Sequence, residues 1–424
     1  MPVTSTLRIV FLGAATLLTA WGQGNPEHWV VTWATSAQIY RAPAPAVPPS
    51  ATPPAANPTA PARPRAPREF NNQTVRMVVH TSIGGKRLRL QLTNPFGGAP
   101  VEVGGAHVAL RDKESSIVAG SDRVVTVAGS KTFRMIPGEA LISDPVDLEF
   151  APLADLAVSL YFPSSTGPLA SHSLGLHTTY ISGEGDFTAQ AAVPEPTTTT
   201  AYYWISAIDV MAPADAAAIV TLGDSITDGA ASTANQDRMW PARLAARLQA
   251  NKATANIAVA NEGISGNRIL MDGSGVAALS RLDHDVLLQT GAKWVMFLEG
   301  INDIGNQVNV NTGLTPADLI AAMRQIVDRA HLAGLKVIGC TLTPYEGAKY
   351  YSEAGEVMRE AENDFIRSSG AFDAVVDFDA AVRDPMNPKR YRTEMQSGDN
   401  LHPSDAGYQA MADAIDLGIF TAKK

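Results

Sequence analysis

The chain has 424 residues, of which 45% are hydrophobic and 18% charged, so it has enough apolar material for two or three globular domains. Its formal net charge of -9 gives no indication of nucleic-acid binding, and its single cysteine excludes an intrachain disulfide. Cys340 lies in an apolar run, where a buried thiol is expected rather than a nucleophile.

The N-terminus has the pattern of an export signal. Arg8 precedes an apolar stretch, residues 9–21, that is too short to span a bilayer, and small residues follow at Ala20 and Gly22. We therefore predict a signal peptide over residues 1–23 and a secreted or periplasmic protein. A membrane tether that is never removed is the alternative. No later stretch is long and apolar enough for stable membrane insertion.

The first half of the chain is rich in short strand patterns separated by turn signals. They predict an antiparallel, jelly-roll-like β-sandwich over residues 25–212. A Pro-rich segment at 41–68 is expected to be an extended loop insertion in this domain. The expected strands cover residues 29–36, 74–81, 86–93, 106–111, 123–127, 146–150 and 156–162, with further candidates at 180–182 and 202–210.

From residue 216 the pattern changes to apolar runs that alternate with helical periodicity. This alternation predicts a flavodoxin-like, doubly wound domain over residues 216–424 with a five-stranded parallel sheet. Its ligand cleft should lie at the carboxyl ends of the strands. The expected strands are 217–222, 255–261, 293–299, 335–341 and 374–378, and the expected helices lie near 238–250, 276–289, 316–333, 353–369 and 404–419.

Polar motifs fall at this edge of the predicted sheet. Ser225 follows the first strand, Gly266 the second and Asn302 the third, while Asp399 and His402 precede the last helix. Cleavage of an ester by serine needs a hydroxyl, a base, an acceptor that orients the base, and donors for the oxyanion. These five residues can supply all four, with the backbone N–H of the serine as a further donor.

Structural roles compete with some of these assignments. Ser225 in an isolated Gly-Asp-Ser would most often cap a helix, Asp399 would bind backbone N–H groups in its turn, and Asn302 would be a turn residue. Gly263 competes with Gly266 as the oxyanion donor.

The ordered set of motifs resembles the SGNH (GDSL) hydrolase family. It comprises Gly-Asp-Ser at 223–225, Gly266, Gly-Ile-Asn-Asp at 300–303, and Asp399 three residues before His402. The resemblance implies that Ser225 is the nucleophile, His402 the base and Asp399 its partner. It also implies that Gly266 and Asn302 form the oxyanion hole. The arrangement of the whole chain is similar to carbohydrate esterases that carry a β-sandwich before an SGNH domain.

Other polar residues are candidates for substrate contact or metal binding. Asn267 and Arg268 follow the oxyanion glycine, and Tyr345 lies in the loop after the fourth strand. We expect these three to contact substrate. His172 and His177 are five residues apart, but no carboxylate or cysteine nearby in the sequence completes a zinc set, so neither a metal nor a cofactor is predicted.

The leading hypothesis is a secreted serine esterase that removes short-chain O-acetyl groups from carbohydrate of the xylan or pectin type. Its partner would be an acetylated polysaccharide or oligosaccharide. A lipase, lysophospholipase or arylesterase on the same scaffold is the alternative. A third possibility is that the sandwich is a carbohydrate-binding module and hydrolysis is secondary.

Overall fold

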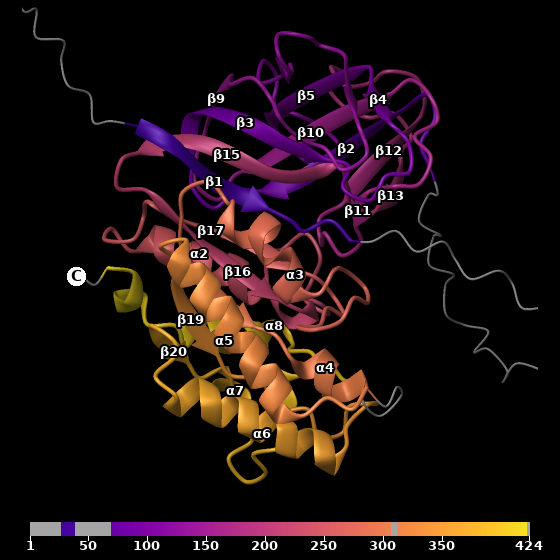
Figure 1. Cartoon of the computed structure of the whole chain (residues 1–424). Helices are drawn as coiled ribbons and strands as arrows, with labels where there is room; N and C mark the ends of the chain where they lie inside the picture. The colour runs from indigo at the N-terminus through magenta and orange to yellow at the C-terminus, as the bar shows by residue number, and fades with distance from the viewer. Residues whose placement is uncertain (1–26, 39–68, 307–311, 422–424) are drawn as a thin grey trace, which may run out of the picture.

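The computed structural model describes residues 27–38, 69–306 and 312–421 (Figure 1). The predicted signal peptide at 1–23 and the Pro-rich insertion at 41–68 lie outside the described residues. Within the described ranges, no helix is sufficiently long and apolar to cross a membrane.

The first half forms two antiparallel sheets, as the strand patterns predict. One sheet has the order β1-β15-β3-β8, with β9 also paired to β3, and the other has the order β13-β12-β2-β10-β5-β6. Their strands are β1 (Glu27–Ala34), β2 (Gln73–His80), β3 (Gly85–Thr93), β5 (Gly105–Leu110), β6 (Arg123–Val124), β8 (Ala140–Ile142), β9 (Val146–Phe150), β10 (Asp155–Phe162), β12 (Thr179–Glu184), β13 (Thr197–Thr199) and β15 (Ile205–Pro213).

Two small strand pairs complete this half. They are β4 (Val101–Val103) with β7 (Phe133–Met135), and β11 (Ser171–His172) with β14 (Tyr202–Tyr203). These strands have only two or three residues, too few for an alternating pattern to be recognised in the sequence. The pair β11–β14 lies beside the second half of the molecule (Figure 1). There His172 of β11 contacts Asp228.

The second half contains the predicted five-stranded parallel sheet. Its order is β17-β16-β18-β19-β20, the flavodoxin-like arrangement with the first strand inside. All seven residues of β16 are buried, which explains its continuous apolar sequence. The strands are β16 (Ala217–Gly223), β17 (Ile257–Gly263), β18 (Ala292–Leu298), β19 (Lys336–Cys340) and β20 (Ala374–Val376).

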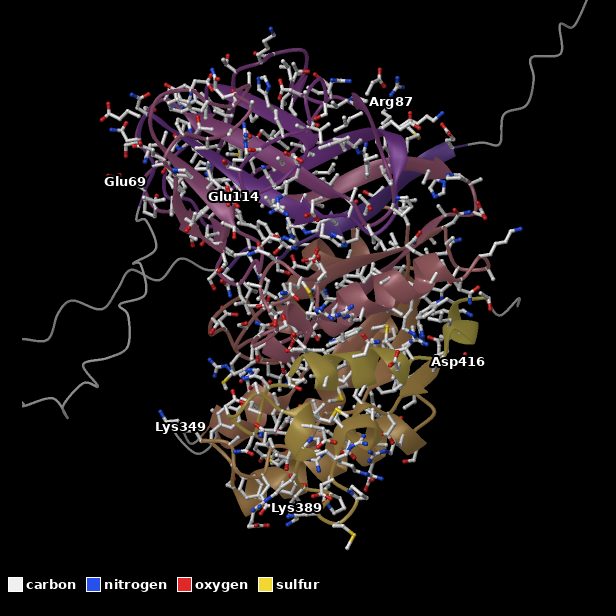
Figure 2. All side chains as sticks on the ribbon, turned by 180° about the vertical axis from the view of Figure 1, so that it is seen from behind. Glu69, Arg87, Glu114, Lys349, Lys389 and Asp416 are labelled. Atoms are coloured by element: carbon white, nitrogen blue, oxygen red, sulfur yellow. The ribbon has the colours of Figure 1, made fainter. Side chains whose placement is uncertain are left out.

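Helices cover both faces of this sheet, with α5 in front in Figure 1 and α8 in front in the reverse view of Figure 2. Charged side chains such as Glu69, Arg87 and Asp416 lie on the outer surface (Figure 2). The helices are α1 (Ser225–Asp228), α2 (Trp240–Ala250), α3 (Ala278–Leu282), α4 (Ile301–Asn306), α5 (Pro316–Leu332), α6 (Glu353–Ser368), α7 (Phe378–Val382) and α8 (Asp405–Asp413).

Two predicted helices are shorter than expected. The helix expected at 276–289 is α3 followed by a π-helical turn, η1 (Asp283–Leu287). The helix expected at 404–419 ends as α8, and Asp416 then caps a separate 3₁₀ turn, η3 (Leu417–Phe420). A further 3₁₀ turn, η2 (Thr393–Met395), precedes α8.

The two halves pack directly on each other. Strand β1 lies against β17, and a backbone hydrogen bond of 2.9 Å crosses the boundary from Val31 N to Thr290 O. The hydroxyl of Ser82 also accepts a hydrogen bond from Val259 N at 3.0 Å. Buried apolar side chains of both halves belong to one continuous core. The antiparallel region therefore forms one side of the α/β domain.

Candidate active site

The turn after β16 places a serine at the carboxyl edge of the sheet, and only glycine fits at the start of this turn. A Cβ on Gly223 would lie 2.2 Å from Thr227 Oγ1 and 2.4 Å from Leu298 O, closer than packed atoms approach. The chain then enters α1 at once, with Asp224 Oδ1 accepting the Ile226 N–H at 2.9 Å. Asp224 is thus the N-cap, and Ser225 is the first residue of the helix at the carboxyl edge of the sheet.

Ser225, His402 and Asp399 form a continuous hydrogen-bonded relay. The distance from Ser225 Oγ to His402 Nε2 is 2.8 Å, and that from His402 Nδ1 to Asp399 Oδ2 is 2.6 Å. A carboxylate only accepts hydrogen bonds, so Nδ1 carries the proton of the neutral imidazole. Nε2 is then the acceptor for the serine hydroxyl, which is the arrangement that general-base activation requires.

Asp399 is held as an anion by its own turn. Its Oδ1 accepts the backbone N–H groups of Leu401 and His402, both at 2.9 Å. Burial raises the pKa of Asp399, but these hydrogen bonds and the bond to the imidazole outweigh it and lower the pKa to about 2. Asp399 therefore has both roles considered from the sequence, because it binds the turn and also orients the base.

The predicted oxyanion glycine occupies a backbone conformation that favours glycine. Gly266 has φ = +78°, and a Cβ there would lie 2.5 Å from Ser274 Oγ. The competing Gly263 already donates its N–H to Asn261 Oδ1 at 3.0 Å. This difference favours Gly266 as the donor from the loop after β17.

Asn302 approaches the same edge from α4, which follows β18. Its side chain is buried, and its Oδ1 accepts a hydrogen bond of 3.4 Å from the Tyr350 hydroxyl. Because the oxygen faces Tyr350, the Nδ2 group is the end of the amide that can donate to an oxyanion. Tyr350 is an orienting residue that the sequence did not single out.

A comparison with known protein families agrees with this geometry. A model of GDSL-like lipases and acylhydrolases matches residues 219–415, the segment that contains the relay. The C-terminal part of the chain is a GDSL-like lipase/acylhydrolase domain. It is therefore a carboxylic ester hydrolase of the SGNH type. No curated protein matches the chain.

Several solved structures are similar to this GDSL-like domain. An α/β hydrolase from the metagenome of Lake Arreo, Spain, has 22% identity and a TM-score of 0.38, and the match covers 49% of this chain and 98% of that one. An acetylxylan esterase from Geobacillus stearothermophilus has 24% identity and a TM-score of 0.37, with 47% and 91% covered. A GDSL-like lipase from Bacteroides thetaiotaomicron has 20% identity and a TM-score of 0.36, with 48% and 87% covered.

A buried carboxylate supports the oxyanion loop of the GDSL-like domain. Asp303, fully buried on α4, accepts the N–H groups of Ile269 at 2.8 Å and Leu270 at 3.3 Å. Burial raises the pKa of Asp303 to about 6, although these hydrogen bonds oppose the shift. Asp303 thereby ties the helix that carries Asn302 to the segment that follows Gly266.

Two of the three residues predicted to contact substrate are buried instead. Asn267 is 0% exposed, donates to Val276 O at 2.9 Å and accepts from Arg281 Nε at 2.9 Å. Tyr345 is also 0% exposed and packs edge-on against Tyr351. These side chains hold the loops together, and their contact with substrate stays a prediction.

Arg268, the third predicted substrate contact, is partly exposed. Its Nη2 donates to Asp272 O at 2.7 Å. A role for Arg268 in substrate contact stays a prediction.

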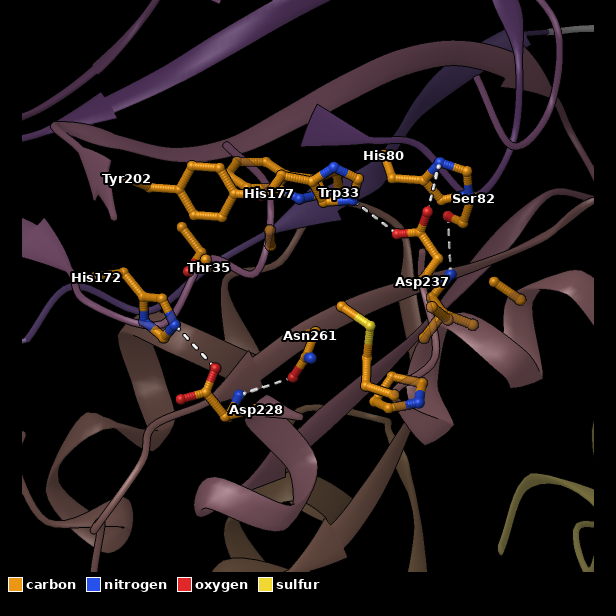
Figure 3. Close-up of a pocket in the computed structure, with 18 of the residues that line it drawn as sticks. Trp33, Thr35, His80, Ser82, His172, His177, Tyr202, Asp228, Asp237 and Asn261 are labelled. Carbon is orange, nitrogen blue, oxygen red and sulfur yellow. Dashed lines mark hydrogen bonds and ion pairs between the residues drawn. The ribbon is translucent and has the colours of Figure 1, made fainter. Parts of the chain in front are cut away.

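A pocket between the two halves, whose lining does not include Ser225, gathers histidines and carboxylates (Figure 3). The potential ligand atoms of His80, Asp155 and Asp237 lie within 4.8 Å of one another. Each already has a protein partner, since His80 Nδ1 bonds Asp155 at 2.8 Å and Asp237 bonds His177 at 2.8 Å. Arg111 also donates to Asp155 at 2.7 Å. The group is an ion-pair cluster across the boundary between the halves.

His172 and His177 each have a carboxylate partner that their local sequence does not contain. His172 Nε2 lies 3.0 Å from Asp228 Oδ1, and His177 Nε2 lies 2.8 Å from Asp237 Oδ1. Both aspartates come from the GDSL-like domain, more than fifty residues further along the chain. Spacing within one segment could not reveal partners that only the packing of two domains brings together.

Proposed function

We propose that the protein is an exported serine esterase that hydrolyses short acyl esters, with O-acetyl groups on carbohydrate as its natural substrates. The observation that carries the proposal is the relay from Asp399 through His402 to Ser225. In the first step the Ser225 oxygen attacks the ester carbonyl while His402 Nε2 takes the hydroxyl proton. The resulting oxyanion is stabilised by the Gly266 N–H and the Asn302 amide.

The second half of the reaction releases the acid. His402 returns its proton to the leaving alcohol, which leaves an acyl-enzyme on Ser225. Water then gives a proton to His402 and attacks the acyl carbon, and collapse of this intermediate frees the acid and restores the serine. Asp399 remains an anion throughout and stabilises the imidazolium that forms twice.

The preference for a short acyl group rests on the openness of the site. The side chain of Asp399 is 50% exposed and that of His402 is 19% exposed, so the relay runs from the surface to Ser225, which is 7% exposed. A long acyl chain needs an extended apolar channel to leave water, whereas an acetyl group needs almost none. A large alcohol such as a polysaccharide can approach such an open site. The export signal predicted at 1–23 supports an extracellular substrate.

Two measurements test the substrate class. In a series of p-nitrophenyl esters from acetate to dodecanoate, we expect kcat/KM to be highest at two to four acyl carbons. We also expect acetate to be released from acetylated xylan. An optimum at eight or more carbons, without acetate release, would favour the lipase alternative and contradict the carbohydrate assignment.

A further inference from the structure

A buried histidine of the antiparallel domain contacts the helix that carries the catalytic serine. His172, on β11, is buried, and its Nε2 lies 3.0 Å from Oδ1 of Asp228. Asp228 is the last residue of α1, the helix that begins with Ser225. This contact therefore joins the antiparallel domain to the turn that holds the nucleophile.

The same aspartate holds the oxyanion loop. Its second oxygen, Oδ2, accepts the backbone N–H of Ser265 at 2.8 Å and the hydroxyl of Ser265 at 2.6 Å. The first bond holds the peptide between Ile264 and Ser265, and the second holds the Ser265 side chain, so Asp228 fixes the residue that directly precedes the Gly266 N–H. The orientation of the predicted oxyanion donor thus depends on where the Asp228 carboxylate stands.

The hydrogen-bond pattern places a proton between His172 and Asp228. Nδ1 of His172 lies 2.9 Å from the carbonyl oxygen of Ser36, which can only accept, so Nδ1 is protonated. An ionised Asp228 accepts at both of its oxygens, so Nε2 then donates as well and the ring is an imidazolium. Burial lowers the pKa of His172. The charge of Asp228, together with hydrogen bonds to Asp228 and to the backbone of Ser36 and Leu174, outweighs burial and raises the pKa above its usual value.

Ser36 anchors the other side of this imidazole. Its carbonyl accepts from His172, while its hydroxyl bonds the Glu262 carboxylate at 2.5 Å and accepts from Arg281 Nη1 at 2.9 Å. Arg281 also donates to the carbonyl of Gly223 at 3.1 Å, next to the nucleophile turn. His172 is thus fixed at both nitrogens, which a residue that sets the position of a carboxylate requires.

We infer that His172 is a positioning residue for catalysis, which acts through Asp228 to orient the Ser265–Gly266 oxyanion loop. The antiparallel domain then contributes directly to the active site, although it supplies no group that touches substrate. This inference rests on the proposed serine esterase mechanism. It predicts that loss of the His172 donor lowers kcat more than it changes KM, because the oxyanion forms only in the transition state.

The test compares two histidines in the full chain. His172→Leu should lower kcat for p-nitrophenyl acetate on the order of 10- to 100-fold with little change in KM, since a small displacement of a positioned group has such effects. His177→Leu is the matched control. His177 is equally buried and also bonds an aspartate of the other domain, Asp237, but Asp237 forms no hydrogen bond to the oxyanion loop within the described residues.

Two further readouts separate positioning from general destabilisation. His172→Gln, which keeps a donor for Asp228, should restore kcat to within several-fold of the wild type. Hydrogen–deuterium exchange in the segment 263–268 should increase in His172→Leu and stay unchanged in His177→Leu. This exchange measurement does not depend on the substrate, so it tests the inference even if the esterase proposal fails. Equal kcat and equal exchange in the two leucine variants would overturn the inference.

Discussion

Asp399 binds His402 twice, with one carboxylate oxygen on the backbone N–H at 2.9 Å and the other on the imidazole Nδ1 at 2.6 Å. A single side chain thus fixes both the position of the residue and the tautomer of its ring. An amide in place of the carboxylate would present a donor to Nδ1 and favour the wrong tautomer.

We therefore expect Asp399→Asn to lower kcat on the order of 10³- to 10⁴-fold, as in other triads where the tautomer is lost. The matched control is Asp405→Asn, because Asp405 also accepts from a backbone N–H and a hydroxyl, those of Thr233, but lies outside the relay. Retention of more than a tenth of kcat in Asp399→Asn would show that the carboxylate does not set the tautomer.

The low pKa of Asp399 makes a prediction about acid. Because its pKa of about 2 in the folded protein lies below the unfolded value, its stabilising effect is complete above about pH 4 and is lost as the pH falls towards 2. Above this range Asp399 stays ionised, and the mechanism requires His402 as the unprotonated base, since an imidazolium cannot act as a base. We expect kcat/KM to fall on the acid side while circular dichroism shows a folded protein. A rate that stays constant down to about pH 4 would contradict the role of His402 as base.

The side-chain amide of Asn302 should stabilise the transition state by donating a hydrogen bond to the oxyanion. Removal of one oxyanion donor typically costs about 10²- to 10³-fold in kcat, and we expect a loss of this size for Asn302→Ala. Tyr350→Phe removes only the hydroxyl that orients the amide, at 3.4 Å, and should have a smaller effect. The measurement is steady-state kinetics on p-nitrophenyl acetate. If Asn302→Ala raises KM alone, the amide binds the ground state and is not an oxyanion donor.

Asp303 should make the stability of the protein depend on pH. Its pKa of about 6 in the folded protein exceeds the unfolded value, so the folded state binds the proton more tightly. The contribution of Asp303 to the free energy of unfolding therefore falls as the pH rises from about 4 through about 6. Asp303→Asn should have a smaller slope in this range, measured by urea unfolding, than the exposed control Asp364→Asn. Identical slopes would show that Asp303 does not titrate in this range.

The parallel fold and the relay could be predicted from the sequence because each depends on a short sequence pattern. Buried strands such as β16 have continuous apolar sequences, which can be recognised directly. Asp399 lies only three residues before His402, so this pair is also visible in the sequence. The helices α1 and α4 were missed because four to six residues are too few for a helical period to appear.

The residues that position the active-site groups could not be predicted, because their partners are distant in the sequence. His172 meets Asp228 across 56 positions of sequence, and Tyr350 meets Asn302 across 48. Only tertiary packing creates these pairs. Asn267 looked like a substrate contact because it follows the oxyanion glycine, yet the turn directs its side chain inwards to Arg281.

The central claim is that Ser225 is the nucleophile of an esterase, and hydrolysis of p-nitrophenyl acetate by the wild type and by Ser225→Ala tests it most directly. Both proteins should be checked for folding by circular dichroism. We predict that the folded variant loses on the order of 10³-fold or more of kcat, the size seen when a triad nucleophile is removed. Unchanged activity in a folded Ser225→Ala protein would contradict the serine mechanism.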